Sequence, residues 1–200
     1  MADPAKKRAT YEDVLNAPPN TVAQILFGTL HVMPRPRVRH AEAASELGSV
    51  VREGFGKRRG GRGPGGWVIL DEPELHLGSD PDVVVPDIAG WRRDRMPRPP
   101  DVAAIEMAPD WVCEILSPGT QHIDRGDKMT IYAREGVSYA WLVDPEERLL
   151  EVYRLIDTQW TRISIHSRDA RVRAEPFDAI EIDLDLLWLE ESPAPAEAAR

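Results

Sequence analysis

The run Trp111-Val112-Cys113-Glu114-Ile115-Leu116 restricts the fold most, because a single acid interrupts it and every other residue is apolar. Short apolar runs of this kind are typical of strands buried on both faces of a sheet. A chain with such a strand needs a covering layer on each side of the sheet. The run therefore predicts a covered central sheet with one carboxylate inside it.

Further strands and helices alternate along the chain. Apolar or alternating runs bounded by turn residues predict strands at 21–26, 30–33, 67–70, 83–91, 139–143, 150–155 and 160–165. The first two form an N-terminal hairpin about Phe27-Gly28, and the last three form a C-terminal antiparallel meander. Helical spacing predicts helices at 38–55 and 123–134, with a short one at 184–189. Residues 92–108 are proline-rich, and we expect them to be irregular.

These elements predict an α/β (α+β) fold in a single domain, which suits a chain of 200 residues. We expect a polar lead-in at 1–20, the domain at 21–190 and a disordered tail at 191–200. No apolar run is long enough to span a membrane, and the N-terminus lacks the apolar core of a secretory signal. The lone Cys113 excludes an internal disulfide, so a cytoplasmic location is expected. No phosphate-loop or dinucleotide fingerprint indicates an organic cofactor.

The charge pattern bears on nucleic acid as a partner. The formal net charge of −9 speaks against it. The charge is uneven, however: residues 35–62 hold eight basic residues against three acids, and a second basic group follows at Arg92, Arg93, Arg95 and Arg98. Such asymmetry can mark a face that binds a polyanion, and the alternative is a solvated loop surface.

Two carboxylates in strand-like surroundings are candidate metal ligands. Asp87 follows the apolar run Val83-Val84-Val85-Pro86, and Glu114 lies inside the central strand. A carboxylate in an apolar strand is costly unless it is paired, solvated or bound to a cation. Two of them on adjacent strands would suit Mg²⁺ or Mn²⁺. Alternatively, Glu114 pairs with an arginine or faces water on an edge strand.

Two basic side chains could assist such a site. Lys128, on the second predicted helix, could orient a water or stabilise a phosphate transition state, or it could be a surface lysine. His40 begins the first helix beside three arginines, where it could touch a phosphate or act as an acid or base. Cys113 is expected to be a buried apolar residue rather than a nucleophile.

Several blocks in order resemble the Uma-type family of restriction endonucleases, within the PD-(D/E)XK nuclease superfamily. They are Val85-Pro86-Asp87-Ile88, residues 108–120, Asp124 with Lys128, Tyr132-Ala133, Gly136-Val137 and residues 139–145. The resemblance covers roughly residues 10–190, and its specific part is 108–145. It implies a restriction-endonuclease-like fold, a central mixed β-sheet flanked by helices.

The resemblance also implies roles for particular residues. Asp87 and Glu114 would hold the metal with the main-chain carbonyl of Ile115, and Lys128 would replace the superfamily lysine at the position of Leu116. In the hairpin, Gln24 stands where the family often has a glutamate, so one carboxylate is replaced by an amide. Glu42 or Glu46 on the first predicted helix could supply a carboxylate instead. The implied contacts to nucleic acid are Gln24, His40, Arg58, Arg59, Arg92 and Arg93.

The sequence thus predicts an endonuclease that hydrolyses DNA with Mg²⁺ or Mn²⁺, using Asp87, Glu114 and Lys128. The alternative is a weak or inactive nuclease-fold module that binds nucleic acid, and a third hypothesis is an enzyme acting on RNA or another phosphoester. A homodimer is expected, because two symmetric sites cut both strands most easily. If DNA is the substrate, the arginines of 35–62 and 92–98 should rim Asp87 and Glu114.

Overall fold

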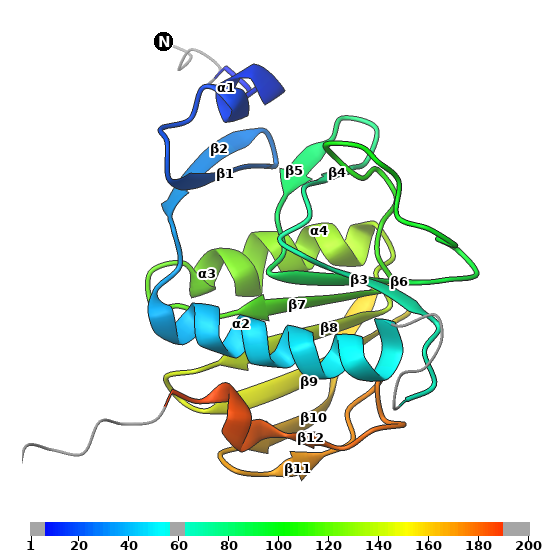
Figure 1. The fold of residues 1–200 in the computed structure, drawn as a ribbon. Coiled ribbons are helices and arrows are strands. Elements are labelled where there is room, and N and C mark those ends of the chain that lie inside the picture. The colour runs from blue at the N-terminus through cyan, green and yellow to red at the C-terminus, as the bar shows by residue number, and fades with distance from the viewer. Residues whose placement is uncertain (1–6, 57–62, 190–200) are drawn as a thin grey trace, which may run out of the picture.

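The computed structural model describes residues 7–56 and 63–189, and a six-stranded mixed sheet forms its centre (Figure 1). In spatial order its strands are β10 (Gln159–Ser167), β9 (Leu149–Ile156), β8 (Tyr139–Asp144), β7 (Trp111–Ile115), β6 (Ile88–Arg92) and β3 (Trp67–Asp71). Only β7 and β8 pair in parallel. The central mixed sheet and the antiparallel meander β8–β10 confirm the prediction.

Helices cover both faces of this sheet. One face carries α2 (Val38–Val51), which continues through the π-helical turn η1 (Arg52–Gly56). The other carries one helical segment made of α3 (Gln121–Ile123), η2 (Asp124–Lys128) and α4 (Met129–Arg134). Both predicted helices are confirmed. The second ends at Arg134, and Gly136 follows with a φ of 74°, which permits the left-handed turn that stops a helix.

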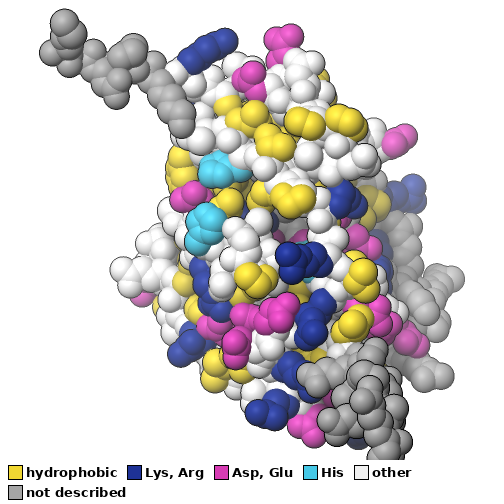
Figure 2. All heavy atoms as spheres, turned by 90° about the vertical axis from the view of Figure 1, so that its left-hand side faces the viewer, with side chains coloured by type: hydrophobic (Ala, Val, Ile, Leu, Met, Phe, Trp, Pro, Cys, Tyr) yellow, Lys and Arg dark blue, Asp and Glu magenta, His cyan; other side chains and the backbone are white. Residues whose placement is uncertain are grey.

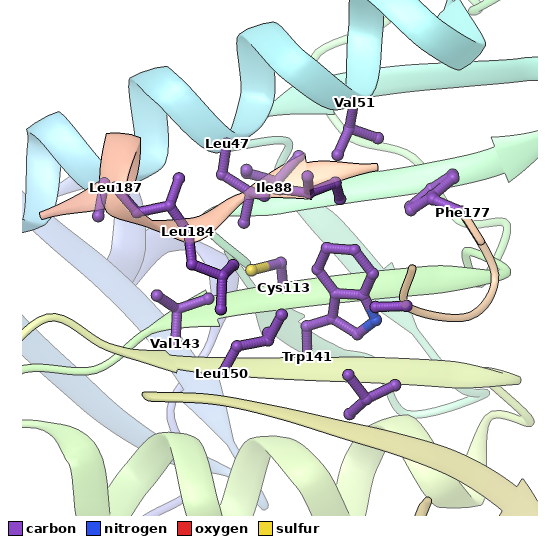
Figure 3. Packing of buried hydrophobic residues seen from close by; sticks show 14 of the residues in the cluster. Leu47, Val51, Ile88, Cys113, Trp141, Val143, Leu150, Phe177, Leu184 and Leu187 are labelled. Carbon is purple, nitrogen blue, oxygen red and sulfur yellow. The ribbon is translucent and has the colours of Figure 1, made fainter. Parts of the chain in front are cut away.

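Side-chain alternation along β7 decides where Glu114 points. Trp111, Cys113 and Ile115 pack in the core on the α2 side, whereas Val112 packs in the core on the α4 side. Because neighbouring strand residues face opposite sides, Glu114 points with Val112 toward α4. Figure 3 shows the first of these cores, with Leu47 and Val51 of α2 above Cys113 and Trp141.

The C-terminal segment completes the core on the α2 side. It contains β11 (Arg171–Val172), β12 (Ile182–Asp183) and the 3-10 turn η3 (Leu184–Leu187) in place of the longer helix expected at 184–189. Phe177 is fully buried, and its ring centroid lies 4.7–5.6 Å from those of Phe55, Trp67, Trp111 and Trp141. This aromatic cluster joins the end of the chain to the central sheet.

A second sheet lies beside the first and contains the predicted hairpin. Its strand order is β2 (Thr29–Pro34), β1 (Thr21–Leu26), β5 (Asp82–Val84) and β4 (Leu75–Leu77). The hairpin β1–β2 is confirmed. The sequence did not predict β4, because a strand of three residues is too short to show a pattern. A short helix, α1 (Tyr11–Leu15), lies within the expected polar lead-in.

The single interrupted strand predicted at 83–91 is wrong. The chain leaves β5 at Val84, passes Val85-Pro86-Asp87 and enters β6 at Ile88 in the other sheet. Pro86 has no N–H to donate to a sheet ladder, so the chain changes sheets there. The crossing places Asp87 between the two sheets.

Three other expectations can be compared with the fold. Residues 92–108 are irregular as predicted, apart from a bridge between Ile105 and Leu75. The expected disordered tail, 191–200, lies outside the described residues. Within those residues, no helix has both the length and the apolar character that crossing a membrane requires.

Candidate active site

Asp87 and Glu114 meet at the neighbouring ends of β6 and β7. Asp87 directly precedes β6, and its Oδ2 accepts a hydrogen bond of 2.6 Å from the N–H of Ile115. The β6–β7 register, in which Ile88 lies opposite Cys113, brings the two acids onto adjacent strands. The structure therefore brings Asp87, Glu114 and Ile115 together, as the metal hypothesis requires.

Glu114 is buried, and both of its carboxylate oxygens are hydrogen-bonded. Only 1% of the residue is exposed. Lys128 Nζ donates to Oε2 over 2.5 Å, and the Tyr132 hydroxyl donates to Oε1 over 2.6 Å. The alternatives of an arginine partner or an exposed edge strand are wrong, because Lys128 occupies one oxygen and β7 lies inside the sheet.

Lys128 joins Glu114 to a third carboxylate. Its Nζ also lies 3.1 Å from Oδ1 of Asp124, one helical turn earlier. Lys128 is only 3% exposed and Asp124 only 6%, so the alternative of a surface lysine is wrong. The turn η2 thus turns one cation and one acid toward β7.

Asp124 and Tyr132 were not assigned roles from the sequence. Their signal was the spacing, since Asp124 lies four residues before Lys128 and Tyr132 four residues after it. Positions i and i+4 share one face of a helix, so the three side chains point toward the same strand. What the spacing alone leaves open is which face of the helix meets the sheet.

The charges of this buried group do not balance locally, because three carboxylates surround one ammonium. Burial raises the pKa of Glu114 to about 8; the Lys128 charge opposes this rise, while Asp124 and Asp87 add to it. Burial likewise raises the pKa of Asp124 against the effect of Lys128. Burial alone would lower the pKa of Lys128, but Glu114, Asp124 and Asp87 outweigh it and raise that pKa.

His40 reaches the same site from the first turn of α2. Its Nε2 lies 3.2 Å from Oδ1 of Asp87. Burial alone would lower the pKa of His40, but the hydrogen bond and charge of Asp87 outweigh it and raise the pKa. Nδ1 is buried and has no hydrogen-bond partner within the described ranges. His40 therefore lies at the site, next to the carboxylate that the sequence singled out.

A cavity of about 300 Å³ opens onto these groups. Asp87, Ile115, Asp124 and Lys128 line one part of it, and Glu114 lies behind them, outside the lining. Gln24 of β1 also lines the cavity, and its Oε1 accepts a hydrogen bond of 2.7 Å from the N–H of Val85. The amide oxygen of Gln24 is therefore hydrogen-bonded to the backbone at Val85, where the chain passes from one sheet to the other.

The donor set of the site suits a hard divalent cation. Among the residues that the structure describes, no three His, Cys, Asp or Glu side chains are grouped closely enough to enclose a metal. Mg²⁺, however, is usually held by one or two carboxylates together with waters and substrate phosphates. Asp87 and Asp124 at the cavity, together with the surplus of carboxylates around Lys128, provide oxygen donors and negative charge of that kind.

Only part of the expected basic rim lies at the cavity. Arg35 and Arg37 line it. Arg92 is at the far end of β6, about 16 Å from Asp87 at the usual rise of a strand, and stacks over Trp67. Arg93 donates to the carbonyls of Gly56 and Pro97.

Arg92 and Arg93 therefore do not line this cavity, because a strand carries its two ends far apart, and their contacts to nucleic acid stay a prediction. The predicted contacts Arg58 and Arg59 lie outside the described residues. Glu42 and Glu46, offered as substitutes for the family glutamate, do not line the cavity. Figure 2 shows that acidic and basic side chains interleave over the lower half of the face at the start of α2.

A second buried acid anchors the turn that carries Lys128. Glu151 of β9 accepts hydrogen bonds from Arg125 (2.6 Å), Tyr153 (2.7 Å) and Arg162 (3.0 Å). Arg125 lies in η2 between Asp124 and Lys128. The Glu151 cluster therefore ties η2 to the meander.

Replacing Glu151 by glutamine should lower the free energy of unfolding at neutral pH by about 1–3 kcal/mol. Burial alone would raise the pKa of Glu151, but the bonds from Arg125, Tyr153 and Arg162 outweigh it and lower the pKa. The stabilisation is thus present above the ordinary glutamate pKa and is lost as pH falls through the lowered folded value. Urea unfolding from pH 7 to pH 3 should show that the free energy of unfolding falls less on acidification in the variant than in the wild type. Identical pH dependence in the two proteins would contradict the prediction.

Comparisons with known proteins agree with this fold. A search of curated proteins finds no match. The chain is similar to a solved structure titled as a putative nuclease belonging to DUF820 from Anabaena variabilis ATCC 29413. That likeness has a TM-score of 0.70 and 24% identity, and it covers 90% of this chain and 97% of the other. The Uma2 family model, described as "Putative restriction endonuclease", matches residues 9–186. With the restriction-endonuclease-like fold and this match over nearly its whole length, the chain belongs to the Uma2 family.

Proposed function

We propose that the protein is a metal-dependent endonuclease that hydrolyses phosphodiester bonds in DNA. The observation that carries the proposal is the meeting of Asp87, Glu114 and Lys128 from three separate segments. Asp87 and Lys128 line one cavity, and Glu114 is buried behind them. Family membership and the oxygen-rich donor set support it. The expected homodimer and the cytoplasmic location remain predictions.

Each residue of the site has a distinct part in this proposal. Asp87, Glu114 and the carbonyl of Ile115 would hold Mg²⁺ or Mn²⁺, which supplies water activation and charge neutralisation at the phosphate. Lys128 orients Glu114 and opposes the rise in its pKa, and its ammonium offsets negative charge that develops on the phosphate. His40, Arg35 and Arg37 offer cationic or hydrogen-bonding groups to the flanking backbone.

Calorimetric titration with Mn²⁺ tests the metal site directly. We expect wild-type protein to bind Mn²⁺, and Asp87→Asn to weaken binding at least about tenfold, since one charged ligand is lost. Asp101→Asn is the matched control, because Asp101 is exposed and does not line the cavity. Equal binding by wild type and Asp87→Asn would contradict the proposal.

One observation favours a second function, a nuclease-fold module that binds nucleic acid without cutting it. Gln24 stands where the family often has a glutamate, and its oxygen already accepts a bond from Val85. Supercoiled plasmid incubated with Mg²⁺ or Mn²⁺ separates the two functions. Cleavage that stops on adding a chelator supports the enzyme, whereas DNA binding without cleavage supports the module.

A further inference from the structure

The cavity beside Asp87 has an apolar wall that phosphate hydrolysis does not use. Besides the carboxylates, Val22 and Met33 of the hairpin line it together with Val85 and Pro118. Phosphate groups and cations need polar surroundings, so this wall suits an apolar part of the substrate. The flat faces of nucleobases are such parts, and they bind proteins by stacking on apolar or aromatic side chains.

The volume of the cavity restricts what can enter. About 300 Å³ lies at the lower limit for pockets that bind small ligands, about 300–1,000 Å³. Such a space accepts one nucleoside-sized group, whereas the bases of a duplex are stacked and paired inside the helix. A base reaches a pocket of this kind only when it is single-stranded or turned out of the stack.

Gln24 presents a polar group to this apolar space. Because a backbone N–H bonds only to an acceptor, the bond from Val85 fixes the amide oxygen and leaves Nε2 as the free end. Gln24 is only 1% exposed, and within the described part of the chain its Nε2 makes no hydrogen bond. Its two hydrogens are available to ring nitrogens or carbonyls at a base edge.

A second cavity, of about 340 Å³, continues the first across Asp87. The two share Arg35, Pro36, His40, Glu72 and Asp87 in their linings. Arg52 lines the second cavity together with Asp71, with which it forms an ion pair. Arg35 pairs at 3.3 Å with the partly exposed Glu72, a surface contact that a phosphate can replace at little cost. The two cavities thus form one groove, with Asp87 in the shared part and with Arg35 and Arg52 each paired to an acid beside it.

Resting on the proposed function, we propose that the substrate is an unpaired DNA strand. The strand follows this groove, and one base next to the cleaved phosphate lies in the first cavity between the hairpin and Pro118, where Gln24 Nε2 donates to its edge. One active site is enough to cut a single strand. The homodimer was expected because a duplex has two strands to cut, and an unpaired strand does not require it.

Two glycines supply a matched pair of variants. Gly119 lines the first cavity, and a Cβ added to it meets no atom within 4 Å. Gly126 has equally open space but does not line the cavity. Gly119→Leu should therefore narrow the cavity without a packing cost, and Gly126→Leu should leave it unchanged. Val22→Phe, on the half-buried hairpin strand, narrows the cavity from the opposite wall.

The test is fluorescence anisotropy with a labelled 12-nucleotide single strand and the corresponding blunt duplex, both in chelator. We expect the single strand to bind at least about tenfold more tightly than the duplex. Gly119→Leu and Val22→Phe should each weaken single-strand binding about tenfold, while Gly126→Leu binds as wild type does. Equal or tighter duplex binding, or single-strand binding unchanged in both cavity variants, would overturn the inference.

Cleavage of the same two DNAs, measured separately with Mg²⁺, distinguishes failure of this inference from failure of the proposed function. Single-strand binding that depends on Gly119 but is not followed by cleavage supports the inference and counts against the enzyme. Cleavage of duplex alone, unaffected by Gly119→Leu, supports the enzyme and overturns the inference.

Discussion

Replacing Asp87 by asparagine should slow DNA cleavage by about 10²–10⁴-fold. A carboxylate that holds the metal ion contributes several kcal/mol to transition-state stabilisation through that ion, and each 1.4 kcal/mol is about tenfold in rate. Asparagine keeps an oxygen that can accept the bond from Ile115 N–H, so the junction of β6 and β7 should survive. Single-turnover cleavage of labelled DNA at saturating Mg²⁺ measures the effect.

The control for this experiment is Asp101→Asn, which removes one exposed carboxylate away from the site. It should cleave at the wild-type rate and melt at the wild-type temperature. Equal cleavage by wild type and Asp87→Asn would show either a contaminating nuclease or an active site elsewhere. Either result contradicts the assignment of Asp87.

Lys128→Met should lower the free energy of unfolding by about 3–5 kcal/mol, the usual cost of removing one partner of a buried ion pair. Methionine fills a similar volume but leaves Glu114 without its 2.5 Å partner and Asp124 without its 3.1 Å partner. Two buried carboxylates would then face each other with no cation between them. Urea unfolding at pH 7 measures the loss. Lys7→Met, at an exposed position, should change stability by no more than about 0.5 kcal/mol.

A second substitution distinguishes the charge effect from a packing defect. In Lys128→Met combined with Glu114→Gln, one of the unpaired charges is gone, so the double variant should lose less stability than the sum of the two single variants. Additive losses would contradict the idea that the ion pair is the stabilising contact. The double variant should remain inactive, since it lacks both a proposed ligand and the lysine.

Much of the fold was predictable because its signals are local. The apolar run at 111–116, the hairpin about Phe27-Gly28 and the helical spacing at 38–55 and 123–134 each describe contacts within one element. Glu114 was found for the same reason, since a carboxylate inside a buried strand is anomalous wherever the strand lies. Asp87 was found from an apolar run, although the single strand assigned to that run was wrong.

The sequence by itself determined most of the strands and helices and which acids are costly to bury, because periodicity and burial cost belong to short segments. Only the tertiary structure decided the partners. The sheet crossing at Pro86 placed Asp87 next to the N–H of Ile115. The packing of the helical segment 121–134 on β7 brought Lys128 and Tyr132 within hydrogen-bond distance of Glu114. The structure also places Arg92 away from the site, although Arg92 is only five residues from Asp87. The reason is that an extended strand carries neighbours in sequence far apart in space.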